Sequence, residues 1–252
     1  MNLARETAAI EPRARPSPLP GFEYVRGWGV YALPLDTGHV LALRVFPEND
    51  FAPYRTIWHR SPEGDWSIYA DSPRLDIACP RYYDSASRRN EHANISLRWT
   101  GPMDLSIEME IPRLTWNLSM TTTGPLTVMN GISRSLPESL WRTPFVLRAF
   151  ERLGRKFFDM GDVTLSGNAP NGHFAIVMPR RMFPVASATV RLEGEDLGRP
   201  ARFERNPSIG RLRLPARPIF AVGRAYFEMR DPEEYRRTVA ALGSDAAVDR
   251  GT

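Results

Sequence analysis

One histidine and one aspartate could form a proton-transfer pair beside a group of aromatic residues. His59 lies on a predicted strand, residues 55–60, and points to the face opposite Trp58. Asp71 begins the loop that follows the next predicted strand. Burial lowers the pKa of a histidine and an acidic neighbour raises it, so this setting can tune His59 either way. We predict His59 and Asp71 as catalytic residues, with a purely structural histidine as the alternative.

Large aromatic residues recur along the predicted strands and could line a pocket for an apolar molecule. An antiparallel sheet with aromatic side chains on one face can enclose an apolar ligand. The loop of residues 71–92 is long enough to act as a lid over such a pocket. A filled hydrophobic core is the alternative. The predicted substrate-binding residues are Trp58, Tyr69, Tyr83, Trp99 and Trp116.

The other residues that often carry chemistry lack the required spacing. Glu108 and Glu110 share one face of a predicted strand, about 7 Å apart, but that polar face is expected to be solvated. Lys156, the single lysine, lies on the polar face of a predicted helix, which disfavours Schiff-base chemistry. The four histidines and the lone Cys79 show no metal-ligand spacing, and no phosphate-binding glycine loop is present. We therefore predict no metal and no cofactor.

Composition and charge indicate a globular protein rather than a nucleic-acid-binding or membrane-spanning one. The chain has 252 residues and a formal net charge of +4, and its basic residues are dispersed. No basic stripe alternates with exposed aromatics, which argues against nucleic-acid binding. No apolar run reaches about 18 residues, so no transmembrane segment is predicted. Residues 1–20 lack the apolar core of a signal peptide, and a single cysteine fits a reducing compartment, so we predict a cytoplasmic location.

A strict alternation of polar and apolar residues over residues 94–120 predicts a three-stranded meander. Gly101-Pro102 and Pro112-Arg113 interrupt the alternation as turns between antiparallel neighbours. A period of two places the apolar residues on one face, which must be buried against a second sheet or the far wall of a barrel. These residues are Ile95, Leu97, Trp99, Leu105, Ile107, Met109, Ile111, Leu114, Trp116, Leu118 and Met120.

Further hairpins and two helices complete the predicted fold. Residues 28–34 and 39–46 flank one turn, and residues 55–60 and 66–70 flank another. Val146, Phe150, Leu153 and Phe157 recur at helical spacing, which predicts an amphipathic helix over residues 145–157. Asp231-Pro232-Glu233-Glu234 is a typical helix start. The fold class is therefore all-β, an antiparallel barrel or two-sheet sandwich of lipocalin-like form, with one inserted helix and a C-terminal helix.

The expected organisation is one β-rich domain with short extensions. The proline-rich residues 1–20 predict an extended, flexible leader. Residues 21–243 form the domain, whose two β-halves could meet near residues 135–160, and residues 244–252 form a tail. The strands expected in the second half lie at about 163–167, 173–178, 185–193, 212–216 and 219–229.

The pattern of residues along the predicted strands resembles that of one known protein group. The segments ISLRWTGPMDLSIEME (95–110), GDVTLSGNAPNGHFAIVMP (161–179) and LPARPIFAVGRAYFEM (214–229) resemble the lipocalin-like carotenoid hydratase group, including AttH-like proteins. The resemblance spans residues 25–230 and includes no catalytic motif that matches residue by residue. It implies an apolar ligand in a β-walled cavity, protonated or cyclised there without a cofactor.

The leading interpretation is a protein that binds an apolar small molecule, terpenoid- or polyketide-like, in a β-walled pocket. If the protein is an enzyme, we expect cofactor-free hydration, isomerisation or cyclisation, with His59 or a carboxylate as proton donor. The alternative is a non-catalytic structural or protein-interaction β-domain. Contact of the basic helix 145–157 with a membrane surface is also left open, as is the oligomeric state. A large cavity would favour ligand binding, and a filled core with an exposed apolar patch would favour the alternative.

Overall fold

Strands form the larger part of the regular secondary structure, as predicted, and helices form the smaller part. The computed structural model describes the backbone of residues 2–248 and the side chains of residues 2–242. The strands are β1 (Arg13–Ala14), β2 (Phe22–Pro34), β3 (Val40–Asn49), β4 (Tyr54–Arg60), β5 (Trp66–Asp71), β6 (Arg89–His92), β7 (Ile95–Trp99), β8 (Asp104–Met109), β9 (Leu114–Met120), β10 (Ser166–Asn168), β11 (Phe174–Leu192), β12 (Glu195–Asp196), β13 (Ser208–Ile209), β14 (Leu212–Arg213) and β15 (Ile219–Glu228).

Six α-helices lie between or beside these strands in the described part of the chain. They are α1 (Leu3–Ala8), α2 (Pro80–Tyr83), α3 (Gly124–Ser135), α4 (Glu138–Trp141), α5 (Pro144–Phe158) and α6 (Pro232–Val248). Two short 3₁₀ turns, Leu75–Ile77 and Asp84–Ala86, flank α2. None of the described helices is both long and apolar enough to cross a lipid bilayer.

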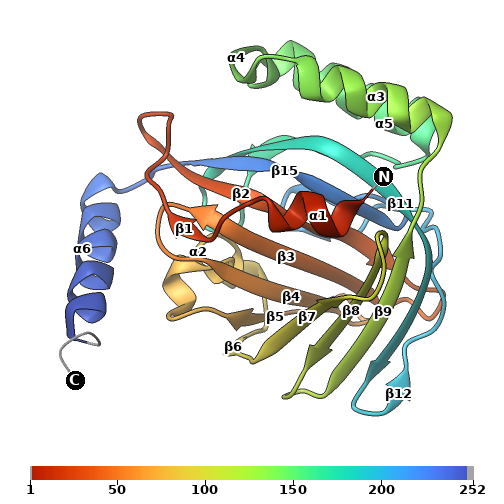
Figure 1. Ribbon diagram of the computed structural model, residues 1–252, viewed down its shortest axis with the longest axis horizontal. Coiled ribbons are helices and arrows are strands. Elements are labelled where there is room, and N and C mark those ends of the chain that lie inside the picture. The colour runs from red at the N-terminus through yellow and green to blue at the C-terminus, as the bar shows by residue number, and fades with distance from the viewer. Residues whose placement is uncertain (1, 249–252) are drawn as a thin grey trace.

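One large sheet curls into half a barrel and forms the body of the protein (Figure 1). Ten of the described strands follow one another in the order β6-β5-β4-β3-β2-β15-β11-β9-β8-β7, and a small second sheet pairs β13 with β14. Neighbours along this order are antiparallel except β5 and β6. The C-terminal strand β15 thus closes the gap between the N-terminal strands and β11, so the two β-halves expected from the sequence share one continuous sheet.

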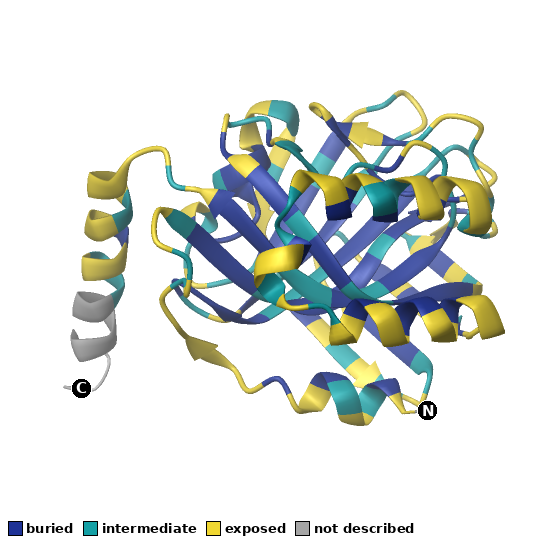
Figure 2. Ribbon diagram, turned by 90° about the horizontal axis from the view of Figure 1, so that it is seen from above, coloured by how far each residue is buried: buried dark blue, intermediate teal, exposed yellow. Residues whose placement is uncertain are grey.

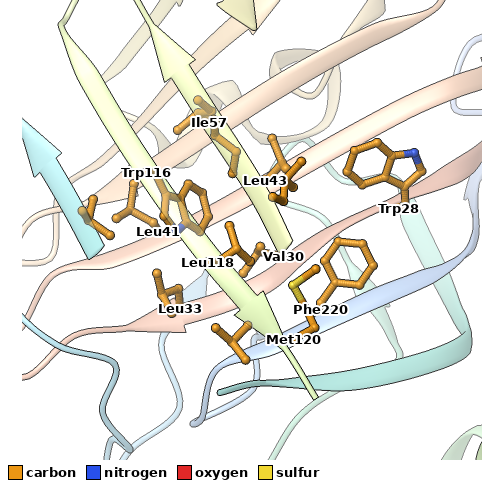
Figure 3. Packing of buried hydrophobic residues seen from close by; sticks show 14 of the residues in the cluster. Trp28, Val30, Leu33, Leu41, Leu43, Ile57, Trp116, Leu118, Met120 and Phe220 are labelled. Carbon is orange, nitrogen blue, oxygen red and sulfur yellow. The ribbon is translucent and has the colours of Figure 1, made fainter. Parts of the chain in front are cut away.

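The inner face of the curled sheet encloses the main hydrophobic core. The meander residues Leu105, Ile107, Leu114, Trp116 and Leu118 are all buried there. They face residues from the opposite half of the sheet, and Figure 3 shows Trp116 and Leu118 among side chains of β2 and β3. The predicted one-sided burial of the meander is therefore confirmed for these positions. The partners from the other half are Trp28, Val30, Leu33, Leu41, Leu43 and Ile57.

The meander prediction fails at Ile111, which is exposed. This residue belongs to the turn between β8 and β9 and not to either strand. Because the turn leaves the sheet, the alternation no longer decides which way the side chain faces.

The outer face of the sheet is covered in two places. The loop that contains α2 and the segment 200–218 pack over β3, β4 and β5, and bury Trp58, Trp66 and Ile68 beneath them. Helices α3, α4 and α5 form a layer over β11 and β15 (Figure 1). The outer face is thus polar only in part, because two separate coverings bury its apolar residues.

The predicted hairpins and helix starts agree with the structure. Strands β2 with β3 and β4 with β5 pair antiparallel across the expected turns. Helix α5 begins after Thr143, whose hydroxyl accepts a hydrogen bond from the Val146 amide. Helix α6 begins after Asp231, whose carboxylate accepts hydrogen bonds from the amides of Glu233 and Glu234. Capping by threonine and aspartate satisfies amides that the helix itself leaves free.

Two expectations about helices and strands need correction. Helix α5 buries Val146, Leu147, Phe150 and Gly154, whereas Leu153 and Phe157 are exposed. The predicted stripe was therefore right for Val146 and Phe150 and wrong for its second part, because the buried face of α5 continues through Gly154 and the partly buried Phe158 instead. The strands expected at 173–178 and 185–193 form one continuous strand, β11. Its first part pairs with β15 and its second part with β9, and each pairing contains a register shift.

The N-terminal segment is more ordered than the expected extended leader. Residues 3–8 form α1, capped by the Asn2 side chain, and Leu3 is fully buried in the inner core. Residues Arg13–Ala14 add a short parallel strand beside β3. Leu3 explains the difference, because burying one leucine anchors a helix that the proline-rich sequence does not reveal. At the other end, α6 continues to Val248, within the predicted tail, and residues 249–252 lie outside the described residues.

Candidate functional site

A pocket lies on the outer face of the sheet, beneath the loop that contains α2. Strands β2, β3, β4, β11 and β15 form its floor, and residues of α2 and of the segment 209–214 form its walls. Its volume is about 100 Å³. Three of its lining residues, Tyr31, Phe46 and Val177, are partly exposed, so the pocket is open to solvent beside them. Most of its lining residues belong to the cluster on the outer face of the sheet, and Trp28 and Leu43 of the inner core also line it.

Aromatic side chains supply most of the pocket wall. The rings of Trp58 and Tyr83 lie 4.7 Å apart, and the Trp58 indole Nε1 donates a hydrogen bond to the Thr56 hydroxyl at 3.0 Å. Burial raises the pKa of Tyr31 to about 12 and raises the pKa of Tyr83 above its usual value. These phenols are neutral at physiological pH, so the wall is uncharged apart from its arginines.

Arg44 is one of two arginines that line the pocket. Its Nη1 donates to the carbonyl oxygens of Val30 (2.6 Å) and Leu43 (3.1 Å), and its Nη2 donates to the carbonyl oxygen of Tyr31 (3.1 Å). The guanidinium carbon lies 4.9 Å from the centre of the Trp58 ring and 5.2 Å from that of Tyr31. Burial lowers the pKa of Arg44. No carboxylate of the described residues pairs with the guanidinium, whose hydrogen bonds go to backbone carbonyl oxygens.

A bulge in β2 positions Arg44. The pairing of β2 with β3 steps from Trp28–Val45 to Leu33–Leu41, so β2 holds one extra residue in this stretch. The carbonyls of residues 30 and 31 accept from Arg44 where the regular ladder is interrupted. Gly29 allows the close approach, because a Cβ atom at this position would lie 2.0 Å from the Leu43 carbonyl oxygen.

The remaining polar groups in the pocket are poorly suited to proton transfer. Cys79 is buried, accepts a hydrogen bond from the Thr56 hydroxyl at 3.3 Å, and has its thiol pKa raised by burial. Burial also raises the pKa of Tyr54. No Asp, Glu or His of the described residues lines the pocket. The arrangement can hold an apolar molecule and an anion, but it places no general acid or base with a pKa near neutrality beside them.

The structure divides the predicted substrate-binding residues between two sites. Trp58 and Tyr83 line the pocket together. Tyr69, Trp99 and Trp116 belong to the inner core, on the other side of the sheet. The division follows from strand periodicity, since Tyr69 opposes Ile57 in the β4–β5 pair and both point inward.

His59 and Asp71 lie apart from the pocket and from each other. His59 opposes Ser67 across the hairpin and Asp71 opposes Arg55, so four residue steps, about 13 Å, separate them along the strands. Asp71 pairs with Arg55 at 3.1 Å. The catalytic roles of His59 and Asp71 stay predictions, but the structure does not bring the two together.

The environment of His59 favours its neutral form. Its Nε2 lies 2.9 Å from Nδ1 of His39, so one ring donates the shared hydrogen and the other accepts it. Burial, with a smaller effect of His39, lowers the pKa of His59 to about 4. His59 is therefore neutral at physiological pH, a state that can accept a proton but is a poor general acid.

Sequence reasoning missed Arg44, Tyr31 and Tyr54 as pocket residues. A signal for Arg44 is present in residues 39–46, where a period of two places it on the same face as Val40, Ala42 and Phe46. An arginine on a face that is otherwise apolar needs a hydrogen-bonding partner or has a functional role. Tyr31 and Tyr54 lie on strands and carry no comparable signal.

Comparison with known proteins adds no relative to this description, since no family model and no curated protein matches the chain.

Proposed function

We propose that the protein binds a small, largely apolar molecule in the pocket between the outer face of the sheet and the loop that contains α2. The observation that carries the proposal is a hollow walled by aromatic and aliphatic side chains in a region where the rest of the sheet is tightly covered. Binding sites of this kind combine an apolar wall with few polar groups. Trp58 and Tyr83 form the aromatic part of the wall.

The volume of the pocket narrows the class of ligand. An apolar cavity of about 150 Å³ holds one benzene molecule, and the volume here is about 100 Å³. A single ring or a short chain therefore fits inside the pocket better than a whole terpenoid or polyketide. One end of such a larger molecule could still enter the pocket. Because no group with a pKa near neutrality lines the pocket, we propose binding without hydration, isomerisation or cyclisation.

Filling the pocket is expected to weaken binding strongly while leaving the fold intact. Val177 lies at the pocket edge and is partly exposed, so Val177→Phe adds volume to an existing hollow. We expect the affinity for toluene to fall at least about tenfold, with stability changed by less than about 1.5 kcal/mol. The measurement is a titration with toluene, followed at the Trp58 indole resonance in ¹H–¹⁵N NMR spectra.

Val128→Phe is the matched control, because the same substitution on the exposed side of α3 leaves the pocket unchanged. It should bind toluene as the unchanged protein does. Absence of toluene binding to the unchanged protein, or equal binding by the Val177→Phe variant, would contradict the proposal.

A second candidate function is peripheral contact with an anionic membrane surface through α3, α4 and α5. Residues 121–158 hold six basic and two acidic residues. Both acidic side chains are engaged by the fold, Glu138 with Arg224 and Glu151 with the Leu165 amide. Figure 2 looks down on this layer and shows long exposed stretches along its helices. The exposed large apolar side chains of the layer are Val128, Ile132, Leu140, Phe145, Leu153 and Phe157.

An apolar helix surface with a surplus of arginine fits an anionic bilayer better than a neutral one. We expect the protein to sediment with phosphatidylglycerol vesicles and not with phosphatidylcholine vesicles. Phe145, which is 77% exposed, should contribute, so Phe145→Ser should weaken sedimentation by about tenfold. Ile111→Ser, at an exposed turn outside this layer, is the matched control and should have no effect. Equal sedimentation with both kinds of vesicle, or with neither, would argue against this candidate.

A further inference from the structure

We propose that the molecule bound in the pocket carries a carboxylate, and that Arg44 is its counterion. The inference rests on the proposed function, since it concerns the same pocket and adds the chemical class of the ligand. An aromatic or short aliphatic carboxylate has both parts that the pocket would recognise. Its apolar part would lie against Trp58 and Tyr83, and its carboxylate would face the guanidinium.

The free donors of Arg44 support this assignment. A guanidinium has five N–H groups, and three of those of Arg44 bond to carbonyl oxygens of residues 30, 31 and 43. Nη1 makes two of these bonds and Nη2 makes one, and Nε–H has no acceptor among the described residues. Nε–H and the adjacent Nη2–H form the edge of a guanidinium that pairs with both oxygens of a carboxylate, and Arg44 uses Nη2 for one bond only.

The charge balance of the pocket supports it as well. Two arginines line the pocket, and the guanidinium of Arg224 forms an ion pair with Glu138. Arg44 has only backbone carbonyls and the rings of Tyr31 and Trp58 around its charge. The Arg44 side chain is partly buried, and a charge withdrawn from water is costly unless it is paired and fully hydrogen-bonded. The unmatched cation therefore favours an anionic ligand over a neutral one.

The test compares benzoate with toluene, which have the same ring and differ in charge. We expect benzoate to bind the unchanged protein at least about tenfold more tightly than toluene, the gain typical of a charge-assisted hydrogen bond. Arg44→Met keeps the length of the side chain and removes the charge. In this variant benzoate should lose that advantage, so that the ratio of its affinity to that of toluene falls to about one. The control Arg88→Met alters an exposed arginine, outside the pocket, and should leave both affinities unchanged.

The outcomes separate this inference from the proposed function. If neither compound binds, the proposed function fails and the inference fails with it. If toluene binds but benzoate binds no more tightly, the pocket stands and the inference is overturned, which leaves Arg44 as a structural support for the β2 bulge. Benzamide provides a further check on the unchanged protein, because it has the shape of benzoate without its charge. Equal affinities for benzamide and benzoate would overturn the inference even if the Arg44→Met variant does not fold.

Discussion

Replacing Arg81 by methionine is expected to lower the free energy of unfolding by about 3–5 kcal/mol, the loss typical of a broken buried ion pair. Arg81 donates to both oxygens of Glu23, from Nε at 2.8 Å and from Nη2 at 2.7 Å. The Glu23 side chain is 0% exposed and that of Arg81 is 5% exposed. Without Arg81, the Glu23 carboxylate stays buried with Tyr82 as its remaining side-chain partner, at 2.6 Å.

Urea unfolding at neutral pH measures this effect. The control is Arg88→Met, because Arg88 pairs with Asp65 at the surface, where both side chains are at least half exposed. Surface pairs contribute about 0–1 kcal/mol, so the control should unfold close to the unchanged protein. A loss below about 1 kcal/mol for Arg81→Met would show that Glu23 finds another partner, or is protonated without cost, when Arg81 is absent.

Trp116→Ala is expected to cost about 3–5 kcal/mol, the range for removing a large aromatic from a packed core. Trp116 is 0% exposed and lies in the inner core, between the meander and the strands of the opposite half. The pocket lies on the other face of the sheet, so toluene binding by the folded variant should be unchanged. Denaturant unfolding and a toluene titration of the same variant measure the two effects.

Trp99→Ala is the control for this prediction, since Trp99 lies on the same meander but is only partly buried at the edge of the core. It should lose less stability than Trp116→Ala. A small loss for Trp116→Ala would mean that the inner core is not tightly packed. Reduced toluene binding by the folded Trp116→Ala variant would instead place the ligand on the inner face, beside three of the five predicted binding residues.

The fold could be predicted where one physical rule decided the local structure. Alternation placed Ile107, Trp116 and Leu118 on the buried face, and Asp231 marked the start of α6. Helix α3 was missed because Gly124, Gly131 and several β-branched residues give it a low intrinsic helix propensity. Tertiary bonds hold α3 instead.

Two polar side chains of α3 make those tertiary bonds to β11. The Asn130 side-chain amide donates to the Met182 carbonyl at 2.9 Å and accepts from the Met182 amide at 2.8 Å. The Ser133 hydroxyl donates to the Pro179 carbonyl at 3.0 Å. A pattern of single residues along the chain does not reveal such pairings, because the partner strand is about 50 residues away.

The candidate site was predicted only in part for a related reason. The sequence shows that Trp58 and Trp116 each lie on a strand, but it does not show which face of the curled sheet is packed and which is hollow. The structure fills the inner face around Trp116 and leaves the pocket beside Trp58. Arg44 takes its place in the site from a bulge in β2, and a bulge changes register without a clear mark in the sequence.

The most direct test of the proposed pocket is to locate bound toluene by nuclear Overhauser effects in the labelled protein. We predict contacts from the toluene methyl and ring protons to the side chains of Trp58, Tyr83 and Val177, which line the pocket on the outer face. Contacts to Trp116 or Trp99 on the inner face, or no saturable contacts at all, would contradict the account.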